Sequence, residues 1–481
     1  MRRTLLIVVA VLSAALNIYG QDILRFSERD QSGTARYVGL AGAMTAVGGD
    51  PSAVLDNPAG LGIYRKVEVS FTFNEMLDYT RQTGTNNRQN FRSAFMLPQT
   101  SLVIALGASN AYNKLKFCNF MLSFNRLKTY NRTSYASAAS YGSVVDVAVE
   151  QAEGLNWPRM NTKSGWNDPE VGWLSLLSYG AYLMDPDESR CPDTTHWKRA
   201  EIVQPTRYGV RIDESGYLDE FNLNWAGNID NRLYIGAGLA VRMLSYAKAY
   251  TYTEDYRLSR GTDLCANLSQ TGVGVHGSVG VMYQPIKMLR LGLSFHTPAI
   301  MTTTTKTNGW MNQVNGAGAR LDTTYMVSEY YSATNKLSLP LRTTVGAAVL
   351  FGHGGLLSVE YDYRHWKNTE DVHTLKVGAE AVLVNNLFMD FGYACESSFR
   401  RSEPIYPLDA TSVRMDSDFR NIGTTHFAGF GIGYRGNFFI AQLGYQFRYQ
   451  PFRLYPYAGT EYADMLSMTH RIVFSFAWHT K

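Results

Sequence analysis

The sequence lacks the features that mark several common protein classes. Beyond its first twenty residues it has no run of about eighteen apolar residues, so it predicts no transmembrane helix. The formal net charge is only +4 in 481 residues, which is not the footprint of a nucleic-acid-binding protein. The nine histidines are scattered without HExxH or paired metal spacing, and no Ser/His/Asp set is evident. We therefore expect no enzyme, no cofactor, no metal and no nucleic-acid partner.

The one phosphate-binding pattern in the chain carries little weight. Gly272, Gly274 and Gly277 fit GxGxxG by letter, but they lie in an alternating stretch with no helix after it. We interpret them as small residues on one face of a strand.

Cysteine is also scarce, with four in the chain. Cys118 and Cys395 fall in distant predicted strands and should be free. Cys191 and Cys265 fall in predicted external loops, where an oxidising environment permits a disulfide. The sequence leaves open whether these two cysteines pair.

What the chain does contain is alternation of apolar and polar residues over long stretches. Leu233, Ile235, Ala237, Leu239 and Val241 share one face, and the intervening residues occupy the other. Several such stretches reach about eleven residues, the length that a tilted transmembrane strand needs. Aromatic residues make up 13% of the chain, with 31 Tyr and 8 Trp, as girdles at two membrane interfaces would require. The pattern predicts a β-barrel that spans a membrane.

The connections between the stretches predict an all-β, 14-stranded antiparallel transmembrane β-barrel. Long junctions (74–99, 127–218, 247–269, 304–340, 398–424, 450–468) alternate with short ones such as Asn228–Asn231 and Pro285–Lys287. Short turns belong on the periplasmic side and long loops outside, which places both termini in the periplasm. The predicted strands are Val67–Phe73, Thr100–Gly107, Lys116–Arg126, Asp219–Gly227, Arg232–Tyr246, Gln270–Gln284, Met288–Thr303, Leu341–Phe351, Leu356–Trp366, Thr374–Val384, Leu387–Ser397, Thr425–Tyr434, Phe438–Tyr449 and Thr469–Trp478.

Two segments precede the predicted barrel of residues 67–481. Residues 1–20 have a basic start and a short apolar core, which predicts a signal peptide and export of a Gram-negative outer-membrane protein. Residues 21–66 are rich in small residues and do not alternate. Asp50-Pro51 resembles a helix start and Asn57-Pro58 a helix end, so we expect a compact hatch inside the barrel. A flexible periplasmic arm is the alternative.

The hatch segment carries a family resemblance. Gly33-Thr34-Ala35-Arg36, Gly48-Gly49-Asp50-Pro51 and Asn57-Pro58-Ala59-Gly60 resemble the N-terminal hatch of FadL-type outer-membrane transporters, among them the TodX-like members. The resemblance implies a fourteen-stranded barrel and passive uptake of hydrophobic compounds such as long-chain fatty acids. It also implies a ligand pocket floored by Asn57, Pro58, Ala59 and Gly60, with lateral release at an inward kink of the third strand. Here that strand, Lys116–Ser123, contains no Gly or Pro.

Charged residues of two neighbouring predicted strands should face the lumen. They are Glu360, Asp362, Arg364, Lys376 and Glu380. Opposite charges on adjacent strands can pair, so we interpret them mainly as a polar ladder that stiffens the barrel, and alternatively as a selectivity feature.

The predicted external segment 127–218 leaves the function open between two classes. A self-packed lid, a ligand-capturing surface and a docking surface all fit its helix-like stretch 141–154 and its Trp residues. The leading interpretation is a hydrophobic-compound transporter with the lipid bilayer and hydrophobic or detergent-like ligands as partners. The alternative is a non-transporting FadL-like barrel that serves as subunit or adaptor of an outer-membrane secretion or assembly complex.

Overall fold

The structure is a computed structural model. It describes residues 25–480 except 85–88, 108–113, 141, 161, 188–194, 202, 258–260, 316–321, 353, 366–369, 385, 399–412 and 458. The predicted signal peptide and Cys191 lie outside the described residues.

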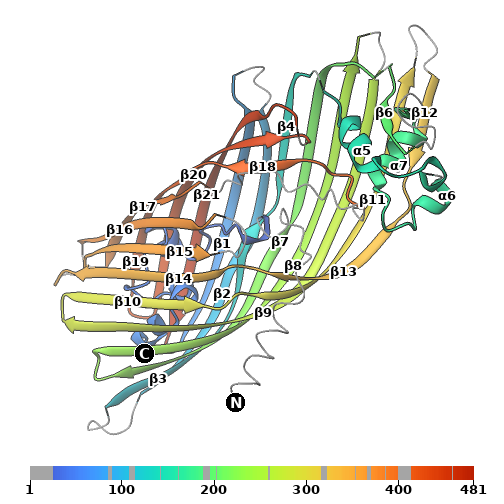
Figure 1. Cartoon of the computed structure of the whole chain (residues 1–481). Helices are drawn as coiled ribbons and strands as arrows, with labels where there is room; N and C mark the ends of the chain where they lie inside the picture. The colour runs from blue at the N-terminus through green and yellow to red at the C-terminus, as the bar shows by residue number, and fades with distance from the viewer. Residues whose placement is uncertain are drawn as a thin grey trace, which may run out of the picture.

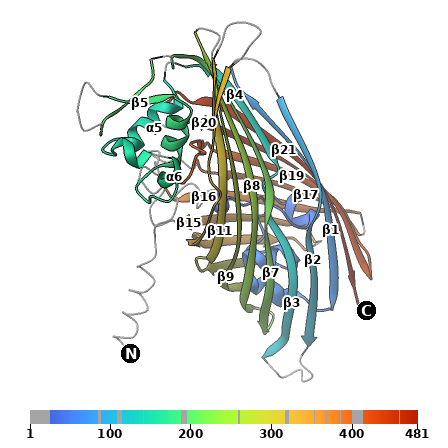
Figure 2. The same cartoon turned by 90° about the vertical axis from the view of Figure 1, so that its right-hand side faces the viewer.

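The chain forms a closed antiparallel β-barrel with fourteen wall positions, as the sequence predicts (Figures 1 and 2). The last wall strand pairs with the first from Glu68↔His479 to Gln82↔Met465, which closes the sheet. The wall strands are β1 (Glu68–Gln82), β2 (Gln89–Gly107), β3 (Leu115–Thr129), β7 (Pro205–Ile229), β8 (Leu233–Tyr256), β9 (Gly261–Ile286), β10 (Leu289–His296) with β11 (Ile300–Asn315), β13 (Tyr331–Ser338) with β14 (Leu341–Leu350), β15 (Leu356–His365), β16 (Val372–Val384), β17 (Leu387–Glu396), β19 (Thr425–Arg435), β20 (Phe439–Tyr455) and β21 (Ala463–His479).

Two wall positions are each broken into two strands at a proline. Pro298 separates β10 from β11, and Pro340 separates β13 from β14. Proline has no N–H to donate to the ladder, so pairing stops there. The predicted single strand Met288–Thr303 is therefore wrong in its continuity.

Short turns gather at one end of the barrel, the turn end, and long connections at the other, the loop end. Asp230 and Asn231 have φ of 51° and 56°, the left-handed conformation of a tight hairpin. The predicted turn Asn228–Asn231 therefore lies where the sequence placed it.

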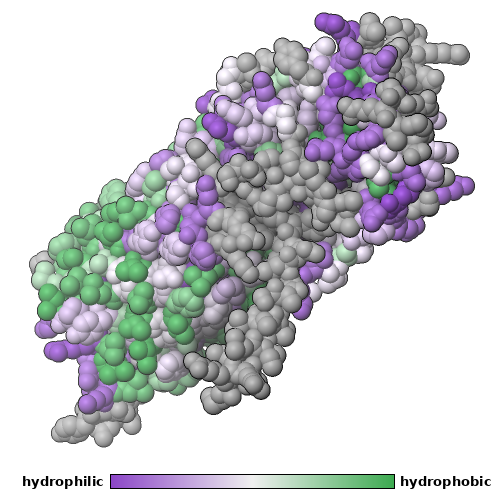
Figure 3. All heavy atoms as spheres, viewed as in Figure 1, coloured by the Kyte–Doolittle hydropathy of each residue, from purple (hydrophilic) through white to green (hydrophobic). Residues whose placement is uncertain are grey.

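The outer surface near the turn end is apolar, and the wall turns its polar side chains inward. Leu223, Leu239 and Val279 are 58%, 60% and 55% exposed, whereas Asn224 and His276 are buried. Figure 3 shows apolar residues gathered over this half and hydrophilic residues toward the loop end. A closed sheet with an apolar outer belt is built to span a bilayer, because its strands satisfy most of their backbone groups by pairing with one another.

Several strands are longer than the sequence predicted. β7, β8 and β9 have 25, 24 and 26 residues, whereas β14 and β15 have 10 each. The predicted loops 74–99, 247–269 and 304–340 consist in large part of strand, which corrects their boundaries. In the extensions of β8, β9 and β11, residues such as Thr, Ser, Asn and Ala take the outward positions, so the apolar alternation fades although the strand continues.

The remaining described elements lie inside the barrel or at its loop end. The hatch, here the described residues 25–66, contains α3 (Ala35–Gly39), α4 (Pro51–Asp56) and η1 (Pro58–Ile63) and lies inside the turn-end half (Figure 1). The cap, residues 140–204, contains α5 (Val144–Ala152), η2 (Trp157–Met160), α6 (Thr162–Gly165), α7 (Trp173–Gly180), β5 (Met184–Pro186) and β6 (Trp197–Arg199). The predicted insertion 127–218 is therefore too wide, because it includes the end of β3, β4 (Arg132–Ala139) and part of β7. Two short strands, β12 (Asp322–Val327) and β18 (Phe419–Ile422), lie at the loop end.

Among the described helices, none has the length and apolar character needed to cross a membrane. Cys118, Cys265 and Cys395 are free and partly buried.

Candidate functional site: the hatch and the lumen above it

The hatch begins and ends its helices with side-chain caps. The Asp50 carboxylate accepts hydrogen bonds from the amides of Ser52 and Ala53 at the start of α4, where Pro51 occupies the first helical position. Thr34 caps α3 and donates its hydroxyl to Asp50 at 2.7 Å. These contacts hold the two helices together without a large apolar core.

The predicted floor residues form the turn between α4 and η1. Asn57 is buried and extended, and its side-chain oxygen accepts the Ala59 amide at 3.1 Å. Its side-chain NH₂ donates to the Thr45 carbonyl at 2.8 Å, which ties the turn to another hatch loop. Pro58, Ala59 and Gly60 are buried beside it. The structure places all four residues against β8 and β9, at the base of the hatch.

The barrel wall approaches the hatch through glycines on neighbouring strands. A methyl group at Gly392 of β17 would overlap the Leu40 backbone, and one at Gly378 of β16 would lie 3.0 Å from the Leu40 carbonyl oxygen. The same holds around the ring, where the wall glycines in contact with the hatch are Gly236, Gly280, Gly292, Gly346, Gly378, Gly392, Gly429 and Gly444. Because glycine has no Cβ, the hatch backbone rests directly on the wall.

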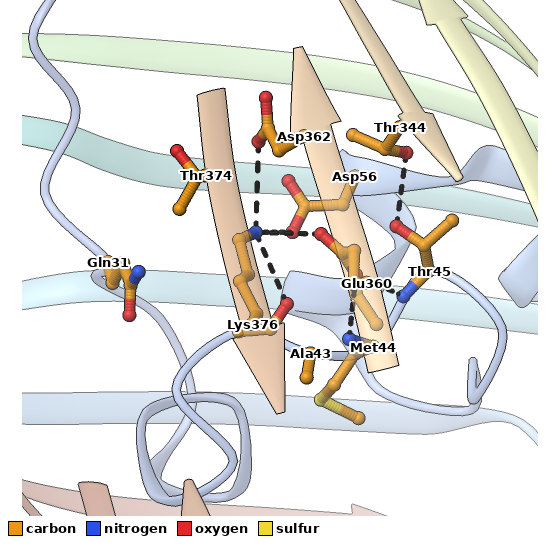
Figure 4. Close-up of polar contacts among 12 residues, drawn as sticks. Gln31, Ala43, Met44, Thr45, Asp56, Thr344, Glu360, Asp362, Thr374 and Lys376 are labelled. Carbon is orange, nitrogen blue, oxygen red and sulfur yellow. Dashed lines mark hydrogen bonds and ion pairs between the residues drawn. The ribbon is translucent and has the colours of Figure 1, made fainter. Parts of the chain in front are cut away.

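Two of the predicted ladder residues bind the hatch as well as each other. Glu360 and Lys376 pair across β15 and β16 at 2.7 Å, as expected for a cross-strand ladder. Glu360 also accepts the amides of Met44 and Thr45 at 3.0 and 2.8 Å (Figure 4). The ladder is thus a clamp on the hatch.

A buried ion cluster joins the clamp to the end of α4. Arg342 pairs with Asp56 and Asp362, each at 2.6 Å, and Lys376 lies 4.0 and 3.8 Å from the same two carboxylates. Tyr37 donates to Asp56 at 2.6 Å. Burial alone would raise the pKa of the Asp56 carboxyl, but Arg342 and Lys376 lower it to about 2.

The other two ladder residues hold different parts of the hatch. Glu380 pairs with Arg36 of α3 at 2.5 Å. Arg364 pairs with Glu396 of the neighbouring strand and donates to the Ser27 carbonyl at 3.4 Å. All five predicted ladder residues therefore face the lumen, and four of them contact the hatch directly.

Above the hatch helices, Phe26 is the one hatch residue in a buried apolar cluster of the lumen, and we call the space that its ring fills the Phe26 pocket. Phe26 is 1% exposed and packs edge to face on Tyr130 and Tyr246, with ring centroids 5.9 and 5.4 Å apart. Apart from the two tyrosines, the pocket is lined by aliphatic residues of several strands and their connections: Leu127, Leu218, Leu244, Leu268, Ala299, Met301, Leu337 and Leu339.

Buried ion pairs surround this pocket. Asp30, four residues after Phe26, pairs with Lys128, Arg448 and Arg471, each at 3.1 Å. These contacts hold the N-terminal segment across the lumen.

The cap closes the loop end with the largest apolar cluster of the described residues. Trp173 of α7 packs on Trp166 with ring centroids 4.9 Å apart, and Leu174 and Leu177 are fully buried. The cluster continues onto the inner faces of the tall strands through Tyr208, Tyr252 and others. Of the three interpretations of this segment, the packing directly supports the self-packed lid.

At the level of the hatch the third strand stays in register with the second, and its register shifts lie in its ladder with β7, between Leu115 and Phe117 and between Arg126 and Lys128. β3 pairs with β2 without a break from Phe117↔Gly107 to Asn125↔Gln99. Above this level the β2–β3 ladder stops. Among the described strands, β2 residues 89–98 pair only with β1. Pro98 marks the point, beside a bulge in the β1–β2 register. We call this unpaired boundary between β2 and β3–β4 the seam.

Side chains bridge the seam. Asn131 donates to the Ser93 carbonyl at 3.1 Å, and Arg92 donates to the Thr133 hydroxyl at 2.8 Å. On its inner side, the Met96 sulfur lies 4.0 Å from the Thr129 hydroxyl, and Thr129 is next in the chain to Tyr130 of the Phe26 pocket.

A cavity of about 490 Å³ lies beneath the hatch at the turn end. Its lining mixes charged residues such as Arg36, Arg290 and Glu68 with apolar residues such as Ile63 and Phe476. No described group of His, Cys, Asp and Glu side chains is arranged to hold a metal ion.

Sequence reasoning missed Phe26, Arg342 and Asp56. Phe26 stands alone in the charged stretch Arg25–Asp30, which was a usable signal, since a lone aromatic residue there needs a place to be buried. Arg342 and Asp56 are 286 residues apart in the chain, and no local pattern connects them.

Comparison with known proteins supports the fold. A FadL homologue from Pseudomonas aeruginosa is 13% identical, with a TM-score of 0.54 over 94% of this chain and 99% of that one. The toluene transporter TodX from Pseudomonas putida is 11% identical, with a TM-score of 0.52 and the same coverages. The monoaromatic hydrocarbon channel CymD is 9% identical, with a TM-score of 0.50.

No protein-family model matches the sequence, and no curated protein matches it. The FadL-type resemblance predicted from the hatch motif is therefore confirmed at the level of the fold, which is that of the FadL-type barrels.

Proposed function

We propose that the protein is an outer-membrane channel for passive uptake of hydrophobic compounds such as long-chain fatty acids. Its turn end, where the last strand ends, faces the periplasm, and the hatch closes that end. The proposal rests on the apolar Phe26 pocket above the hatch helices. Of the hatch residues, only Phe26 enters it.

The chemistry of the pocket suits an apolar ligand. Leu, Met and Ala side chains supply most of its wall, and Tyr130 and Tyr246 supply flat faces. The Phe26 ring is about the size of a monoaromatic hydrocarbon, so the pocket already accommodates that shape. A ligand that displaces Phe26 would gain comparable apolar burial.

The seam supplies a lateral route between this pocket and the membrane. Among the described residues only side-chain contacts cross it, whereas on their other side β3 and β4 keep a backbone ladder with β7. Phe95 on its outer side is 73% exposed, which presents an apolar surface to lipid. An apolar molecule that moves sideways returns to lipid without crossing polar solvent.

The structural neighbours are consistent with this proposal. TodX is described as a toluene transporter and CymD as a monoaromatic hydrocarbon channel, and both share the fold over almost their whole length.

Replacement of Phe26 tests the proposal. Phe26→Ala leaves an empty pocket, so an entering ligand no longer has to displace a buried ring, whose burial is worth about 1.5–3 kcal/mol. We expect the affinity of the purified protein for a fluorescent long-chain fatty acid or for toluene to rise about tenfold or more. Leu268→Asp in the pocket wall should abolish binding in the same assay.

Phe95→Ala, which removes an outward ring of the same size, is the matched control and should leave the affinity unchanged. If the wild-type protein and Phe26→Ala both bind neither probe, the channel proposal is wrong.

The cap favours a second candidate, a non-transporting adaptor of an outer-membrane secretion or assembly complex. Trp157 and Tyr182 are 49% and 67% exposed on the cap, and Tyr182 adopts a left-handed backbone with φ of 58°. Large exposed aromatic residues suit a protein contact. Trp157→Ala with Tyr182→Ala should then release a stoichiometric partner from native membranes while Phe26→Ala has no effect. A wild-type protein that purifies alone would exclude this role.

A further inference from the structure

A trough crosses the outer face of the tall strands. It has a volume of about 490 Å³ and runs at one height over β7, β8, β9 and β11. Its floor is made of small outward residues that pair across these strands: Ser215, Ala247, Ala249, Asn267 and Ser269. Larger residues form its two ends, with Arg92 and Asn131 at the seam and Lys306, Asn308 and Tyr330 at β11 and beyond.

The trough lies just above the apolar belt. On β8, Met243 is 43% exposed and ends the belt, and Ala247 follows four residues later. On β9, Val273 is 52% exposed and Ser269 lies four residues away toward the loop end. Four residues of a strand tilted by about 40° rise roughly 10 Å. A phospholipid headgroup layer is only about 6 Å deep. The trough therefore lies at a height that only a lipid with a taller headgroup can reach.

The ends of the trough carry excess positive charge. At the seam end, Asp213 lines the trough and pairs at 2.9 Å with Arg92 of the lining and at 2.7 Å with Arg211, which lies beside the trough, so two cations share one carboxylate. Among the described residues Lys306 has no ion-pair partner, and it is exposed at the opposite end. The two ends are about three strand spacings apart, or roughly 14 Å.

The remaining lining suits a sugar. Asn131, Asn267 and Asn308 offer amides and Ser215 and Ser269 offer hydroxyls, all within the trough. Tyr330 is 65% exposed and presents an aromatic ring on which the apolar face of a sugar can pack.

We propose that this trough binds the phosphorylated sugar headgroup of an outer-leaflet glycolipid, whose acyl chains lie against the apolar belt below. The sugar occupies the floor across β8 and β9, and phosphate groups meet Lys306 at one end and the Arg92–Arg211 pair at the other. Charge-assisted hydrogen bonds from these cations supply much of the affinity. The inference is independent of whether the lumen conducts a hydrophobic compound.

Binding of a purified bisphosphorylated diglucosamine glycolipid to the full-length protein tests the inference. Lys306→Glu removes one cationic end, and Ala249→Trp fills the floor. Each should weaken binding in detergent micelles about tenfold, the equivalent of about 1.4 kcal/mol. Native mass spectrometry of protein extracted from its own membrane should show the same glycolipid lost from both variants. The shift in gel mobility on heating checks that each variant is folded.

Lys336→Glu is the matched control, because Lys336 is exposed on β13 nearer the bilayer and outside the trough. It should leave glycolipid binding unchanged. Equal loss in Lys336→Glu would overturn the inference, since the attraction would then be general. Displacement of the glycolipid by phosphatidylglycerol at equal concentration, or by millimolar inorganic phosphate, would also overturn it.

Discussion

The two halves of the lumen are packed by opposite means. At the turn end the hatch rests on wall glycines and is held by buried ions, with Glu360, Lys376 and Arg342 contacting its backbone and carboxylates. At the loop end the cap has a conventional apolar core around Trp166 and Trp173. The hatch has many hydrogen bonds and small apolar clusters, whereas the cap cluster is the largest among the described residues.

The difference follows from the space that each half offers. The membrane-spanning wall encloses a narrow lumen with polar inward residues, so a plug there must be made of small residues and must pair the wall's charges. The tall strands extend beyond the bilayer and can turn tyrosines inward to meet helices, as Tyr208 and Tyr252 do. The hatch is therefore held in place by ion pairs, whereas the stability of the cap depends on how well its apolar core is packed.

The largest expected effect comes from Arg342→Met, which breaks the clamp. It leaves Asp56 and Asp362 buried beside each other with only Lys376 near both, a loss of about 3–5 kcal/mol in hatch attachment. Hydrogen exchange at the amides of residues 40–60 should accelerate strongly while exchange in the cap stays unchanged. Trp173→Ala should produce the reverse pattern. If either variant loosens both halves equally, the halves are one cooperative unit.

Much of the fold could be predicted from sequence, because lipid outside and polar groups inside impose a period of two on each wall strand. The fourteen wall positions and the turn Asn228–Asn231 followed from that alternation. The upper ends of β8 and β11 did not, because there the outer face meets water and residues such as Thr251 and Thr304 carry no apolar signal. Cap packing, which the sequence does not display, keeps those ends folded.

The candidate site could be predicted only in part. Glu360 and Lys376 pair on adjacent strands, and a register inferred from alternation already brings them together. The contacts of Glu360 with Met44 and Thr45 join positions more than 300 residues apart. Such contacts depend on how the hatch enters the barrel, which no single-sequence pattern encodes.

The second largest effect is expected from a comparison of two arginine substitutions on β8, one in the apolar belt and one in the extension above it. Leu239→Arg places a charge in the lipid-facing belt of β8 and should cost about 2–4 kcal/mol if it lies near the bilayer centre. Thr251→Arg, on the same face of β8 above the belt, should cost little, because water surrounds it. The fraction of heat-modifiable, membrane-inserted protein measures both. Equal insertion of the two variants would contradict the position of the belt.

A third, smaller effect concerns the glycine contacts of the hatch. Gly392→Val would drive side-chain atoms into the Leu40 backbone and should destabilise the seated hatch by about 1–3 kcal/mol. Gly352→Val is the control, since nothing lies within 4 Å of a Cβ there. Protease sensitivity of the hatch in the folded barrel should rise in the first variant and not in the second. Unchanged sensitivity in Gly392→Val would mean that the hatch can move away from the wall easily.

The smallest effect is expected at the predicted floor. Replacing Asn57 and Pro58 together by Ala removes the cap of η1 and the Asn57 bond to the Thr45 carbonyl, for a loss of about 1 kcal/mol. The barrel should still fold, because its ladders do not involve these residues. The clamp adjoins the floor, but Glu360 holds the Thr45 amide and Arg342 holds Asp56, contacts that the variant leaves in place, so the hatch should stay seated while its base loosens.

This variant therefore separates the floor from the clamp. A channel would keep ligand affinity at the Phe26 pocket but leak small polar solutes past the base of the hatch, which liposome swelling measures. Swelling equal to that of the wild type would show that the clamp alone seals the barrel. The Asn57–Gly60 motif would then serve to pack the hatch against β8 and β9, and not to block the passage of solutes.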